Sequence, residues 1–90
     1  MSASDSATGH RPLDFQTFVL SLGTSALVQL GEAPVPGQTS FEKDVEGARQ
    51  TIDILAMLET KTAGNLTEQE SSLLRNLLTD LRLRFVRAGK

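Results

Sequence analysis

The sequence predicts an all-α domain with three helices, at about residues 15–30, 40–62 and 68–87, within a single domain at 13–88. Two observations favour this class. Apolar residues recur at helical spacing in all three segments, and a residue that caps helix starts precedes each one. Glycine then follows the first two segments, where a left-handed residue ends a helix. Residues 1–12 hold little to bury, so they predict a disordered tail.

The first segment, DFQTFVLSLGTSALVQLGE, has no charged residue between Asp14 and Glu32. Asp14 is a good N-cap, and Gly31 is a natural stop. Apolar residues lie on nearly every side of this helix. We therefore expect other parts of the protein or a second chain to cover it on more than one side. Small residues in its middle permit close approach of another backbone. We expect an interface between copies of the chain at Phe18, Leu20, Gly23, Leu27 and Val28.

The second segment begins after a loop that contains Pro34, Pro36 and Gly37. Thr39 and Glu42 have the spacing of a capping box, which predicts a helix from residue 40. The apolar stripe that follows contains Phe41, Val45, Ala48, Ile52 and Leu55. The opposite face is polar, and Arg49 lies one turn before Asp53, so we expect an ion pair there.

The third segment follows a short connection in which Gly64 ends the second helix. Thr67 and Glu70 form a second capping box. A connection this short predicts that the second and third helices form an antiparallel hairpin, on which the first helix packs. The third helix buries a stripe of leucines, and Asp80 and Arg84 are spaced as an ion pair on its polar side.

The end of the third helix is basic. Cations near a helix C-terminus favour the helix dipole, and their aliphatic stems cover apolar surface. A docking patch for an acidic partner, a phosphate-bearing ligand or RNA is the functional alternative. Its candidate residues are Arg75, Arg82, Arg84 and Arg87.

Nothing in the composition indicates catalysis or a bound cofactor or metal. The chain has no Cys, which excludes thiolate catalysis and zinc–thiolate sites, and its one histidine, His10, lies in the predicted tail. The net charge of −2 shows no excess of basic residues of the kind that nucleic-acid binding requires. The absence of Cys and of a secretory signal pattern favours a cytoplasmic protein. We therefore expect no enzyme.

Three runs carry a resemblance to a known family: DFQTFVLSLGTSALVQLGE, ARQTIDILAMLETKTAGNLT and LLRNLLTDLRLRFV. They resemble a family of short bacterial proteins catalogued only as a domain of unknown function. Similar sequences are expected to have proline after the NLT turn, where this chain has Glu68, and both residues suit a first helical position. The resemblance implies a bacterial, compact helical protein and assigns no activity, cofactor or site residue.

We therefore expect a non-catalytic helical interaction or adaptor module that assembles as a homo-oligomer and has an unidentified protein partner. Two alternatives stay open. A peripheral membrane protein would insert the first helix into lipid, and a nucleic-acid-linked regulator would use the arginines of the third helix. A membrane-spanning first helix is disfavoured by its short length and its several polar residues.

Overall fold

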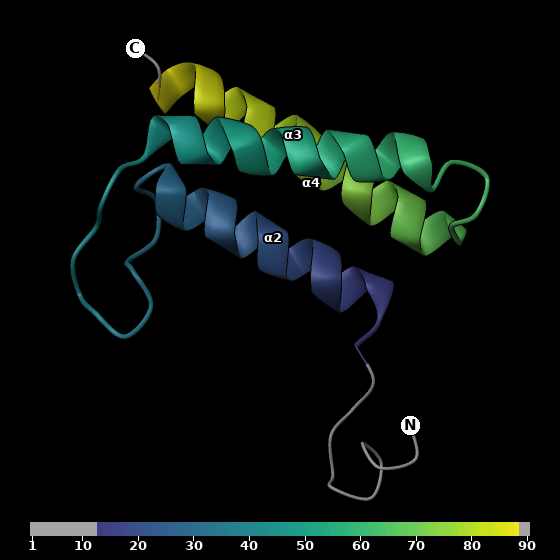
Figure 1. Ribbon diagram of the computed structural model, residues 1–90, viewed down its shortest axis with the longest axis horizontal. Coiled ribbons are helices and arrows are strands. Elements are labelled where there is room, and N and C mark those ends of the chain that lie inside the picture. The colour runs from purple at the N-terminus through teal and green to yellow at the C-terminus, as the bar shows by residue number, and fades with distance from the viewer. Residues whose placement is uncertain (1–12, 89–90) are drawn as a thin grey trace, which may run out of the picture.

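A computed structural model describes residues 13–88, which form three α-helices packed on one another and no β-strand (Figure 1). In chain order these are α2 (Phe15–Gln29), α3 (Val45–Lys61) and α4 (Glu68–Ala88). The predicted all-α class with three helices is confirmed. The predicted tail at 1–12 lies outside the described residues.

Both ends of α2 form at the predicted cap residues. Asp14 Oδ1 accepts a hydrogen bond from the Thr17 amide at 2.8 Å. At the other end Gly31 has a φ of +78°, and the Glu32 amide donates to the Leu27 carbonyl at 2.9 Å. This pair of features closes the helix with a Schellman motif, in which a left-handed glycine turns the chain back on its last carbonyls. The last helical residue is Gln29, where the prediction has residue 30.

The predicted start of α3 is wrong. The helix begins at Val45, not at residue 40, because Asp44 is its N-cap and accepts from the Gly47 amide at 3.0 Å. Ser40 belongs to the preceding loop, where its carbonyl accepts from the Val35 amide at 2.9 Å. The Asp44 amide donates to the Gln29 carbonyl at 2.7 Å, which fixes the cap against the end of α2. Phe41 therefore lies outside the helix and is 60% exposed.

The predicted start of α4 is confirmed. The Glu70 amide donates to Thr67 Oγ1 at 3.1 Å, and the Thr67 amide donates to Glu70 Oε1 at 2.9 Å. These two bonds are a capping box, which satisfies two amides that a helix start leaves without partners. Gly64 has the expected left-handed conformation, with a φ of +82°.

The core lies where the three helices meet. α3 and α4 contact one another and both contact α2, and Figure 1 shows them on the same side of α2. α2 therefore has one face against its own chain and another directed away from it. The buried apolar side chains are Val19, Ala26, Leu30, Ala48, Ile52, Leu55, Leu74, Leu78 and Leu81.

A polar contact joins α2 to α3 beside this core. Thr51 is 7% exposed, and its hydroxyl donates to the Gly47 carbonyl at 3.1 Å. That hydroxyl has one proton, so the Gln29 amide nitrogen is assigned to face it, at 2.7 Å from Thr51 Oγ1 and 3.2 Å from the Ser25 carbonyl. The arrangement gives a buried hydroxyl both an acceptor and a donor. It also fixes the position of α2 along α3.

Candidate interaction surfaces

The side of α2 that faces away from its own chain is uncharged and partly apolar. We define the outer face of α2 as Thr17, Leu20, Ser21, Thr24 and Val28, which share one side at helical spacing. The first four are exposed and Val28 is half-buried. Leu20 keeps 50% of its surface exposed.

The structure divides the five residues of the predicted interface. Leu20 and Val28 lie on the outer face of α2, and Phe18 lies at its edge with 36% exposure. Gly23 is a correction because it is buried against α4, where a Cβ atom would lie 2.9 Å from Leu77 Cδ2. Leu27 is half-buried and packs against the core. The small residue at 23 therefore serves close packing within the chain.

A shallow cleft of about 230 Å³ adjoins the outer face of α2 near the C-terminal end of the helix. Val28 and Pro36 contribute apolar surface, and Thr24 and Ser25 contribute hydroxyls. Pro36 comes from the loop between α2 and α3, so this loop forms one wall. The cleft extends the uncharged surface of α2 onto the loop.

The four arginines of the predicted partner patch do not form one patch. Arg75, Arg82 and Arg87 are exposed, whereas Arg84 is half-buried. Residues 82 and 84 are two positions apart on a helix, which directs them to nearly opposite sides. The expected basic patch is therefore divided between two sides of α4.

Arg84 is engaged within its own chain. Its Nε donates to Asp80 Oδ2 at 2.8 Å, which confirms the predicted ion pair, and its Nη1 contacts Glu32 Oε1 in the loop after α2. The hydrogen bond to Asp80 and then the bond to Glu32 raise the pKa of Arg84 above its usual value. Arg84 thus joins α4 to the end of α2 and is removed from the predicted patch.

A second cleft of about 230 Å³ lies between α3 and α4. Ile52, Phe85 and Val86 line it together with Arg82 and with the Arg49–Asp53 pair. Arg49 donates to Glu46 at 2.9 Å and lies 3.8 Å from Asp53, which confirms the predicted pair and adds Glu46 to it. The hydrogen bond to Glu46 is the main reason that the pKa of Arg49 is raised. The charges around this cleft are largely balanced, so it offers little preference for an anion.

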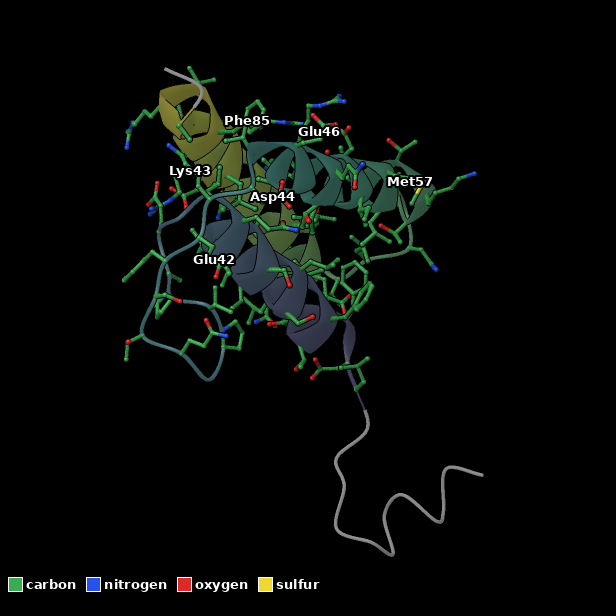
Figure 2. All side chains as sticks on the ribbon, turned by 60° about the vertical axis from the view of Figure 1, so that its left-hand side comes forward. Glu42, Lys43, Asp44, Glu46, Met57 and Phe85 are labelled. Atoms are coloured by element: carbon green, nitrogen blue, oxygen red, sulfur yellow. The ribbon has the colours of Figure 1, made fainter. Side chains whose placement is uncertain are left out.

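Several apolar residues of α3 and α4 are also exposed. Met57 on α3 and Leu83 and Val86 on α4 are each more than half exposed, and Ile54 is 41% exposed. Figure 2 shows the labelled Met57 near the C-terminal end of α3, far from the loop between α2 and α3. Ile54, Leu83 and Val86 each adjoin a charged residue in the sequence, and Met57 lies two positions before Glu59. These charges separate them from the continuous uncharged run of α2.

None of the helices within residues 13–88 has the length and apolar character that crossing a membrane requires. Those residues contain no group of three or more His, Cys, Asp or Glu side chains that could hold a metal ion.

No curated protein and no solved structure is similar enough to this chain to count as a match. A family model does match, and it covers residues 12–87, which include α2, α3, the loops between the helices and all of α4 except its last residue. Its description, Domain of unknown function, agrees with the resemblance carried by the three sequence runs. The chain therefore belongs to the family described as Domain of unknown function (DUF1844).

Proposed function

We propose that this protein is a non-catalytic helical interaction module that assembles with copies of itself through the outer face of α2. In this proposal α3 and α4 form an antiparallel hairpin that supports α2 from one side. The second copy covers α2 from the other side. The assembled protein then presents the remaining surfaces, including the exposed arginines of α4, to another protein.

The observation that carries the proposal is the absence of charge on α2. The surface sides of α3 and α4 carry charged residues in every turn or two, as helices of a monomer normally do. From Phe15 to Gly31 the chain has no charged residue, although Leu20 and Phe18 are exposed. This uncharged strip, with its exposed Leu20 and Phe18, supports the proposal that another copy covers α2.

The size of this strip sets the expected strength of assembly. α2 has 15 residues, so the outer face is about 22 Å long and about 10 Å wide. Such a strip is well below the roughly 800 Å² that each partner buries in a standard interface. We therefore expect a dimer that dissociates on dilution, unless the loop between α2 and α3 adds contact area.

The experiment that tests the proposal measures molar mass by light scattering over a dilution series. The parent should approach twice the monomer mass at high concentration, and Leu20→Glu should remain a monomer. Met57→Glu is the matched control because Met57 is 51% exposed and Leu20 is 50% exposed. Circular dichroism checks that all three proteins are folded. A parent that stays monomeric at every concentration would refute the proposal.

The two alternatives have less support. Peripheral membrane helices usually carry Lys or Arg beside their apolar face, and α2 carries neither. Nucleic-acid binding needs a continuous basic surface, whereas the arginines of α4 lie on different sides and Arg84 is paired with Asp80 and Glu32. Neither alternative has an observation of its own in its favour.

A further inference from the structure

We draw no further inference here: the strongest candidate, the cleft between α3 and α4 beside the exposed Arg82 and Val86, is bordered by largely balanced charges, and nothing in the structure shows what covers it.

Discussion

Gly23 offers the sharpest test of how α2 packs within its own chain. A Cβ at this position would lie 2.9 Å from Leu77 Cδ2 and 3.0 Å from Leu77 Cδ1. Contacts this short require the ends of the flexible, half-buried Leu77 side chain to move aside, which places the cost at the low end of the roughly 1–3 kcal/mol that overpacking causes. Replacing a helical glycine by alanine gains back a part of that, up to about 1 kcal/mol of helix propensity. We therefore expect Gly23→Ala to lower the free energy of unfolding by no more than about 1 kcal/mol.

The effect of Gly23→Ala on the free energy of unfolding should change sign once Leu77 is shortened. Leu77→Ala removes both methyl groups that the new Cβ would meet, so Gly23→Ala should then gain stability by up to about 1 kcal/mol. Urea unfolding followed by circular dichroism measures all four proteins of this cycle. Ser21→Ala, an exposed change on the same helix, controls for propensity alone. Equal effects of Gly23→Ala in both backgrounds would refute the packing of Gly23 on α4.

Three further predictions concern α3 and its neighbours. Asp44→Ala should lower the free energy of unfolding by about 1 kcal/mol because it removes the N-cap of α3, whereas Glu42→Ala should leave urea unfolding nearly unchanged. Thr51→Val should cost about 1 kcal/mol in the same assay because it removes the hydrogen bond between the buried Thr51 hydroxyl and the half-buried Gln29 amide, while Thr60→Val at an exposed site should cost little. Arg84→Gln should lower the melting temperature more at low salt than at high salt, because salt screens the ion pairs that the substitution removes. A drop in melting temperature that is the same at both salt concentrations would show that these ion pairs do not contribute to stability. The pKa of Arg84 is raised by its hydrogen bonds to Asp80 and Glu32, so the guanidinium stays charged and its contribution to stability shows no change across the neutral range.

Most of the fold could be predicted because its signals are local. Asp14 and Gly31 bound α2, and the Thr67–Glu70 capping box begins α4, since each needs only residues within one turn. The prediction of where α3 starts was wrong because two local signals compete there. Thr39 with Glu42 has the better pattern, but a contact distant in sequence, from the Asp44 amide to the Gln29 carbonyl, selects the later start.

The candidate surfaces were less predictable because periodicity shows that a helix is apolar without showing what covers it. Gly23 permits close approach of any backbone, and only the packing of Leu77 identifies that neighbour as α4 of the same chain. The sequence likewise pairs Arg84 with Asp80 at helical spacing. The further partner Glu32 lies 52 residues away and has no local signature.

The two sides of α2 can be separated experimentally. Gly23→Ala acts on the side against α4 and should reduce stability without changing molar mass, whereas Leu20→Glu acts on the outer face and should reduce molar mass. If Leu20→Glu also unfolds the chain, then assembly and folding are one equilibrium, and stability should rise with protein concentration. A melting temperature that does not change over the dilution series would instead show that α3 and α4 alone hold α2 in place. The outer face would then be free to bind and release a second copy without loss of the fold.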